Sequence, residues 1–125
     1  MKNRQEYEKE GRRAEKRVAS YLKRRGYSIL AERFKTRYGE VDIIARKGPV
    51  IAFVEVKQRS TQKAIDESIT SQAENRIMAS SEIWVERHFD TLPKDFELRF
   101  DFAAILGEVS PFCKIQYLEN AFYYS

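Results

Sequence analysis

The chain has 125 residues, of which 42% are hydrophobic and 34% charged, and its formal net charge is +4. This length supports one compact domain with one core, and the composition excludes an intrinsically disordered chain. No run of 18 apolar residues could span a membrane, and the polar start lacks the apolar segment of a secretion signal. The single cysteine, Cys113, excludes an internal disulfide and a thiolate metal cage. We therefore expect a single domain over residues 1–125 in a cytoplasmic setting.

Charge is unevenly distributed along the chain. Residues 1–64 carry a net charge of +10, whereas residues 65–125 carry −6. A basic half favours a polyanionic partner, and nucleic acid is the common case, although many small basic proteins bind none. The acidic second half leaves open a different function, that of an adaptor that docks a basic protein.

The first predicted element is a helix over about residues 8–25, after a start that we expect to be frayed within residues 1–10. Ala14, Val18 and Leu22 recur at helical spacing and form one apolar stripe. Gly26 then ends the helix. The opposite face is basic and is either solvated or available to phosphates: Arg12, Arg13, Lys16, Lys23 and Arg24.

Three strands follow, at Tyr27–Phe34, Val41–Arg46 and Val50–Lys57. Their aromatic and β-branched residues are typical of strands. The third strand is apolar on both faces, which predicts a central position in the sheet.

The second half adds one helix and two strands. Residues Ser60–Ser68 read as a loop, and Ser71 with Glu74 fits a capping box at the start of a helix that runs to about Phe89. Strands are predicted at Phe96–Leu106 and Phe112–Leu118. The predicted fold is an α/β domain with a mixed five-stranded sheet flanked by helices, in the order α-β-β-β-α-β-β.

The second and third strands should form a hairpin with Gly48-Pro49 at its tip. Residues whose numbers add up to 97 then face each other, so that Asp42 lies opposite Glu55 and Glu40 opposite Lys57. Alternation would put these three carboxylates and the ammonium group on one face. A loop longer or shorter by one residue would separate Asp42 from Glu55.

Two opposed carboxylates repel each other unless one is protonated or a cation lies between them. Carboxylate oxygens suit Mg²⁺ or Mn²⁺, and Mg²⁺ commonly uses one or two carboxylates together with substrate phosphates. The pattern therefore predicts a site for phosphodiester chemistry, in which Lys57 contacts the attacking water or the reacting phosphate. The alternative is a solvated ladder of surface charges.

Four segments, in this order, resemble the YraN-like family of uncharacterised bacterial proteins: Gly11-x-x-x-Glu15, Gly39-Glu40-Val41-Asp42, Phe53-Val54-Glu55-Val56-Lys57-x-Arg59 and Arg99-Phe100-Asp101. The resemblance spans about residues 11–106. It implies a restriction-endonuclease-like fold, of the PD-(D/E)XK superfamily, similar to archaeal Holliday-junction resolvases. The implied activity is that of an endonuclease that uses Mg²⁺ or Mn²⁺ to hydrolyse structured or branched DNA.

The resemblance also implies residue roles. The implied catalytic residues are Glu15, Asp42, Glu55, Lys57 and Gln72. The implied metal ligands are Asp42, Glu55 and the carbonyl of Val56, with Glu40 as an accessory acid. The chain departs from the family near the second helix, where Ala73 stands in place of a frequent lysine.

Phosphate contacts are expected from the basic residues of the first half: Arg12, Arg13, Lys16, Arg33, Lys35, Arg37 and Arg59. A homodimer would present two sites to two strands, and Tyr123-Tyr124 could pack across the domain or in such a dimer. A module of the same fold that binds nucleic acid without cleaving it is the alternative. We expect Asp101 to have a structural role and Trp84 to lie in the core.

Overall fold

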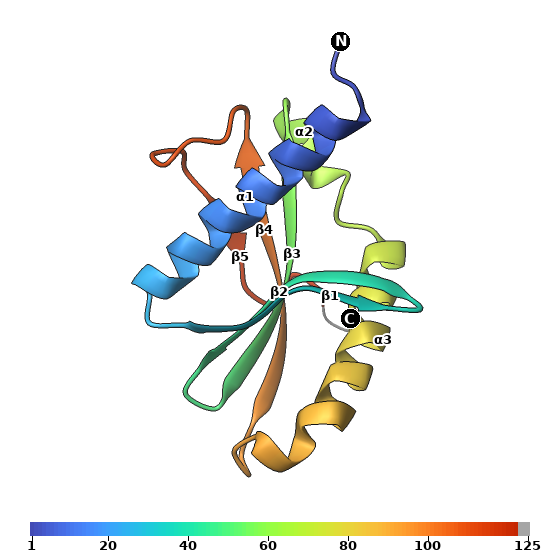
Figure 1. The fold of residues 1–125 in the computed structure, drawn as a ribbon, viewed down its shortest axis with the longest axis vertical. Helices are drawn as coiled ribbons and strands as arrows, with labels where there is room; N and C mark the ends of the chain where they lie inside the picture. The colour runs from blue at the N-terminus through green and yellow to red at the C-terminus, as the bar shows by residue number, and fades with distance from the viewer. Residues whose placement is uncertain (123–125) are drawn as a thin grey trace.

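The computed structural model describes residues 1–122 (Figure 1), so Tyr123-Tyr124 lies outside the described residues. The helices are α1 (Arg4–Arg24), α2 (Gln62–Asp66), α3 (Ser71–His88) and the short 3₁₀ helix η1 (Phe89–Thr91). The strands are β1 (Ser28–Thr36), β2 (Gly39–Lys47), β3 (Val50–Arg59), β4 (Glu97–Leu106) and β5 (Gln116–Leu118). Within this part of the chain, no helix has the length and apolarity needed to cross a membrane.

The five strands form one mixed sheet in the order β1-β2-β3-β4-β5. Strands β3 and β4 pair in parallel, and the other neighbours are antiparallel. The predicted fold class and the central place of β3 are confirmed. The hairpin register is confirmed near the turn, where the pairs run from Lys47 opposite Val50 to Ile43 opposite Val54. The paired residues end there, before the expected pairs Asp42–Glu55 and Glu40–Lys57.

Local capping explains where the helices differ from prediction. Helix α1 starts at Arg4, before the expected position, because the Asn3 side chain accepts a hydrogen bond from the amide of Glu6. Thr61 caps α2 inside the segment that was expected to be a loop. The cap of α3 is Thr70 rather than Ser71.

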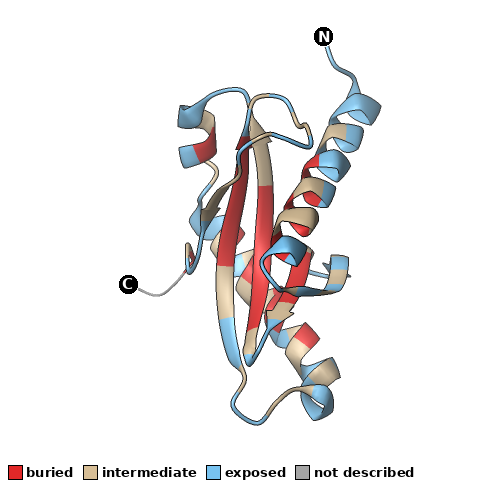
Figure 2. Ribbon diagram, turned by 90° about the vertical axis from the view of Figure 1, so that its left-hand side faces the viewer, coloured by how far each residue is buried: buried red, intermediate tan, exposed pale blue. Residues whose placement is uncertain are grey.

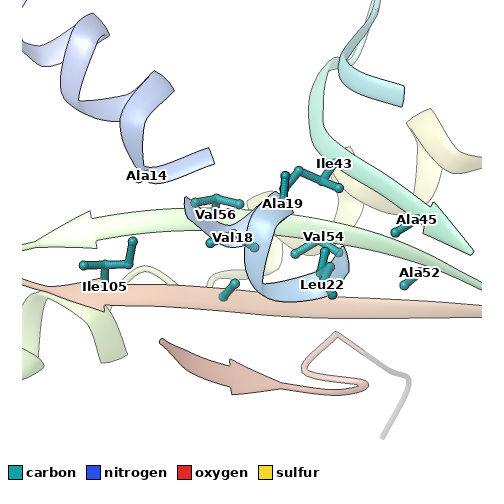
Figure 3. Packing of buried hydrophobic residues seen from close by; sticks show 11 residues of the cluster. Ala14, Val18, Ala19, Leu22, Ile43, Ala45, Ala52, Val54, Val56 and Ile105 are labelled. Carbon is teal, nitrogen blue, oxygen red and sulfur yellow. The ribbon is translucent and has the colours of Figure 1, made fainter. Parts of the chain in front are cut away.

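Helices cover both faces of the sheet, with α1 on one face and α3 on the other (Figure 1). We call the two groups of buried side chains the α1-side core and the α3-side core. Figure 3 shows the α1-side core, in which Val18 and Leu22 of α1 lie against Val54 and Val56 of β3. The α3-side core includes Ile44, Phe53 and Trp84, so the prediction for Trp84 is confirmed. Buried residues therefore concentrate in the middle of the central strands (Figure 2).

One expected face assignment on β2 is wrong. Alternation would place Val41 and Ile43 on the same face, but Val41 packs in the α3-side core and Ile43 in the α1-side core. The neighbouring residue on β1 explains the switch. Arg33 has φ of +55°, in the left-handed region that non-glycine residues seldom adopt. This position lies between the pairs Glu32–Ile43 and Phe34–Val41, so the change of face occurs at Asp42.

A buried ionic cluster fixes the last strand to the sheet. Asp101 of β4 is fully buried, and Arg99 donates two bonds to it from Nε, both of 3.0 Å. The Tyr117 hydroxyl on β5 donates to the same carboxylate at 2.5 Å, and the Asn120 amide donates at 3.1 Å. The position of Asp101 between Arg99, β5 and the following turn supports the expected structural role.

Candidate active site

A cleft of about 720 Å³ lies between the first half of α1 and the ends of β2 and β3. Three of the predicted catalytic residues line it, Glu15 from α1, Asp42 from β2 and Lys57 from β3. Val56 and Arg59 of β3 also contribute to the wall. The sheet and α1 therefore bring together Glu15 and Lys57, which lie 42 positions apart in the sequence.

Asp42 is positioned by the backbone of the neighbouring strand. Its Oδ2 atom accepts a hydrogen bond of 2.7 Å from the amide of Val56. Burial raises the pKa of Asp42, and the Val56 amide and the cations Lys57, Arg76 and Arg33 oppose that shift. The carboxylate is thus held in place while its charge is only partly compensated, which favours binding of a further cation.

Lys57 is half-buried in the same cleft. Burial lowers the pKa of Lys57, Arg59 lowers it further, and Asp42 raises it. A lysine that is partly desolvated beside a carboxylate makes a stronger electrostatic contact than a solvated one. Perturbed groups of opposite charge in a cleft are typical of functional sites.

Arg33 connects two of the predicted acids. Its Nε atom lies 3.1 Å from Oε1 of Glu15 and 3.8 Å from Oε1 of Glu40. Both oxygens are buried, and neither accepts a hydrogen bond from the described residues. Arg33 was predicted to bind nucleic acid, but in the structure its guanidinium group faces these carboxylates instead.

Replacing Glu15 with glutamine should change how stability depends on pH. Burial, followed by the charge of Asp42, raises the pKa of Glu15 to about 7 from an ordinary value of 4.5. The folded state therefore retains this proton more strongly than the unfolded state does, so Glu15 lowers stability as pH rises from about 4.5 to about 7. In the Glu15→Gln variant this loss, at most about 3 kcal/mol, should be absent.

Urea unfolding of both proteins at pH 5 and pH 8, in the presence of a chelator, measures the difference. The unfolding free energy of the glutamine variant minus that of the wild type should be larger at pH 8 than at pH 5. Parallel pH profiles for the two proteins would contradict the raised pKa.

Glu55 departs from the predicted arrangement. The sequence placed Glu40, Asp42, Glu55 and Lys57 on one face, but the Glu55 carboxylate forms an ion pair and hydrogen bond with Arg76 of α3. Asp42 instead lines the cleft beneath α1. The single-face arrangement is wrong because β2 changes face at Asp42, beside the left-handed backbone of Arg33 on β1, whereas β3 keeps its alternation through Val56. Alternation alone cannot show such a change.

Gly39 makes room for Arg76. It has φ of +127°, and a Cβ atom added there would lie 2.4 Å from Cδ of Arg76. A Gly39→Ala variant should therefore displace Arg76 from Glu55 and lose about 2–4 kcal/mol of unfolding free energy, through backbone strain and a buried carboxylate without its partner.

The matched control is Gly48→Ala, because Gly48 also has a positive φ, of +60°, but nothing lies within 4 Å of the added Cβ. Urea unfolding should show the smaller loss for this control. An equal loss in the two variants would mean that backbone strain alone explains the effect and that Arg76 is not displaced.

The donors near this strand end suit a hard divalent cation. The three ligands implied by the resemblance, Asp42, Glu55 and the Val56 carbonyl, would all offer oxygen atoms, and Mg²⁺ completes such a set with water and phosphate oxygens. Within residues 1–122, no three acidic, histidine or cysteine side chains gather into a closed metal cage. The donor chemistry therefore fits an open site with few protein ligands, and Glu55 would join it only after release from Arg76.

The remaining predicted residues lie around the cleft or outside it. Gln72 is exposed in the first turn of α3 and does not line the cleft. Arg12, Arg13 and Lys16 are exposed on α1, and Lys35 and Arg37 lie exposed around the β1–β2 turn. Sequence reasoning had left the role of Arg76 open, and the 21-residue separation from Glu55 gave no local signal for their contact.

Comparison with known proteins identifies the family. Residues 14–105 match the uncharacterised protein family UPF0102. The chain belongs to the UPF0102 family. A UPF0102 protein of Mesorhizobium japonicum is 40% identical over 121 residues, which cover 97% of this chain and 92% of that protein. A UPF0102 protein of Rhodopseudomonas palustris is 43% identical over 101 residues, covering 81% and 76%.

A third UPF0102 protein, from Agrobacterium fabrum, is 41% identical over 108 residues, which cover 86% of this chain and 87% of that protein. The resemblance to the YraN-like family is thereby confirmed. The UPF0102 match begins within α1 and ends within β4, so it contains Glu15, Asp42, Glu55 and Lys57.

Proposed function

We propose that this chain is a metal-dependent endonuclease that hydrolyses phosphodiester bonds of structured or branched DNA in the cytoplasm. One observation carries the proposal: Glu15, Asp42 and Lys57 line one cleft, in which the pKa values of the acids are raised and that of the lysine is lowered. Such opposed shifts suit groups that exchange protons or stabilise developing charge.

The residues have separable roles in this proposal. When bound, Mg²⁺ or Mn²⁺ would neutralise phosphate charge and lower the pKa of a water molecule, and Asp42, Glu55 and the Val56 carbonyl would hold it. Lys57 would donate a hydrogen bond to the phosphoryl oxygen that gains negative charge as the bond from the water oxygen to phosphorus forms and the bond from phosphorus to the leaving ester oxygen breaks. Glu15, with a pKa of about 7, is suited to accept the proton of that water.

Basic residues around the cleft would hold the DNA backbone. Exposed Arg12 and Lys16 on α1 and Lys35 on β1 are available for phosphate contacts, and Arg59 reaches the cleft itself. Affinity should then fall as the salt concentration rises. A homodimer that presents two such clefts to two strands is part of the same proposal.

A substrate panel tests the proposal. Branched, flayed, single-stranded and duplex DNA would be incubated with the wild type in Mg²⁺ or Mn²⁺, and in a chelator as control. We expect cleavage of branched or flayed substrates, dependent on the metal and lost in Asp42→Ala. Cleavage that survives Asp42→Ala would show that this cleft is not the active site. If the wild type cleaves none of the substrates, the proposed activity is excluded.

A second function is favoured by the state of Glu55. Because Arg76 engages this carboxylate, the chain could bind nucleic acid without cleaving it. Salt-sensitive binding that is lost on substitution of Arg12 and Lys16, unchanged in Asp42→Ala and without cleavage in any metal, would support this alternative over the nuclease.

A further inference from the structure

We propose a second nucleic-acid contact, a groove that binds a single-stranded DNA segment and stacks an unpaired base on Phe112. The groove is lined by the second half of α1 and by the loop of residues 107–115 that joins β4 to β5. It is separate from the cleft that holds Asp42. The inference rests on the proposed function in one respect, because it specifies a single-stranded segment in the DNA substrate of the proposed endonuclease.

The loop that carries Phe112 is anchored on both sides of that residue. Arg13 donates a 3.0 Å hydrogen bond to the carbonyl of Val109, and Arg17 donates a 2.9 Å hydrogen bond to the carbonyl of Cys113. Cys113 and Ile115 also pack against the α1-side core. The loop is therefore held against α1 by side chains that lie 96 positions earlier in the sequence.

Phe112 nevertheless points into solvent, with a relative exposure of 93%. An exposed phenyl ring on an anchored loop contributes nothing to the core, and its apolar surface favours a partner that covers it. The flat face of an unpaired base is such a partner, and stacking of this kind does not depend on base identity.

The surroundings of Phe112 are cationic. Arg24, Arg25 and Lys114 line the same cleft, of about 430 Å³, and Lys16 lines an adjoining cleft of about 350 Å³ beside Pro111. Among the described residues, no acidic side chain lines either cleft. Within residues 1–122, none of these four cations forms an ion pair with a carboxylate. Their charge is therefore available to a phosphate backbone.

A single strand fits this combination better than a duplex does. In a duplex the faces of the bases are stacked on one another and closed to an aromatic side chain, whereas unpaired bases can be splayed out. Cations that follow the backbone and an aromatic ring that stacks bases are the two parts of a single-strand binding groove. The groove has both within one helix–loop surface.

The helix sets the distance between the groove and the proposed site of cleavage. Glu15 and Arg24 lie on α1 nine residues apart, which is about 13 Å along the axis at 1.5 Å per residue. At 3.4 Å for each nucleotide, this is about four nucleotides. The substrate would therefore have a single-stranded arm that begins about four nucleotides from the reacting phosphate.

Fluorescence anisotropy with a labelled single strand and a labelled duplex, both in chelator, tests the groove without any cleavage. Phe112→Ala should weaken single-strand binding about tenfold and leave duplex binding unchanged. The matched control is Phe89→Ala, because Phe89 is also exposed, at 61%, but lies at the end of α3. This control should bind both DNAs as the wild type does. Arg24→Ala should lower the slope of log affinity against log salt concentration for the single strand by about one, as expected for the loss of one phosphate contact.

Unchanged single-strand binding in Phe112→Ala, or an equal loss in Phe89→Ala, would overturn the inference. Sedimentation of the same variants covers the remaining possibility: a dimer that dissociates in Phe112→Ala while DNA binding is kept would assign Phe112 to a contact between two copies. If single-strand binding depends on Phe112 but the protein cleaves no substrate, the proposed nuclease activity is refuted and the groove is supported.

Discussion

An Asp101→Ala variant should lose about 3–5 kcal/mol of unfolding free energy, the cost of leaving a buried ion without its partner. Asp101 is fully buried, and Arg99, its main partner, has a side chain only 15% exposed. Burial, followed by the charge of Asp101, raises the pKa of Tyr117, so its hydroxyl stays protonated and donates to the carboxylate. Alanine would remove the carboxylate that accepts hydrogen bonds from both Arg99 and Tyr117. Native proteins have about 5–15 kcal/mol of stability in total, so the variant should be close to unfolding.

Urea unfolding measures this loss. The matched control is Glu119→Ala, because Glu119 also faces Arg99, at 3.7 Å, but its side chain is 62% exposed. An exposed ion pair contributes about 0–1 kcal/mol, so the control should unfold almost as the wild type does. Similar small losses in the two variants would show that the buried cluster is not what holds β5 to the sheet.

Lys57→Ala should reduce DNA cleavage about 10²–10³-fold, the usual effect of removing one group that stabilises transition-state charge. Lys57 lies half-buried beside Asp42, where its pKa is lowered. Lys57 lines the same cleft as Asp42, and alanine cannot replace the hydrogen bond proposed for the lysine. Because burial of the ammonium group is itself unfavourable, the variant should keep its fold and its melting temperature.

Single-turnover cleavage and thermal melting test this prediction together. Lys63→Ala is the control, since Lys63 also has a positive charge but is 85% exposed on α2, where it pairs with Glu67. It should cleave at the wild-type rate. Wild-type cleavage by folded Lys57→Ala would remove Lys57 from the mechanism, whereas loss of folding would assign it a structural role.

The sequence predicted part of the cleft beside α1, but it did not predict the contact of Arg76 with Glu55. The Gly48-Pro49 turn and the alternating apolar residues predicted the β2–β3 register correctly, because both signals are local and a one-residue slip would expose the core. The basic face of α1 was also correctly predicted, with Arg12, Arg13 and Lys16 exposed. Asp42 and Lys57 were expected to lie close together, and both line one cleft, but the single-face arrangement from which this was expected is not the one that the structure shows.

The sequence by itself therefore determined the fold class, the central strand and the register of the β2–β3 hairpin near its turn, since these depend on short-range periodicity and turn chemistry. Glu15 entered the candidate site only through the family resemblance. Only the tertiary structure decided which acids share a surface. The left-handed backbone of Arg33 changes the face at Asp42, and Arg76 reaches Glu55 across the space left by Gly39. The anchoring of the loop beside Phe112 likewise depends on arginines 96 positions away. Such contacts join residues far apart in the chain, so no local sequence pattern predicts them.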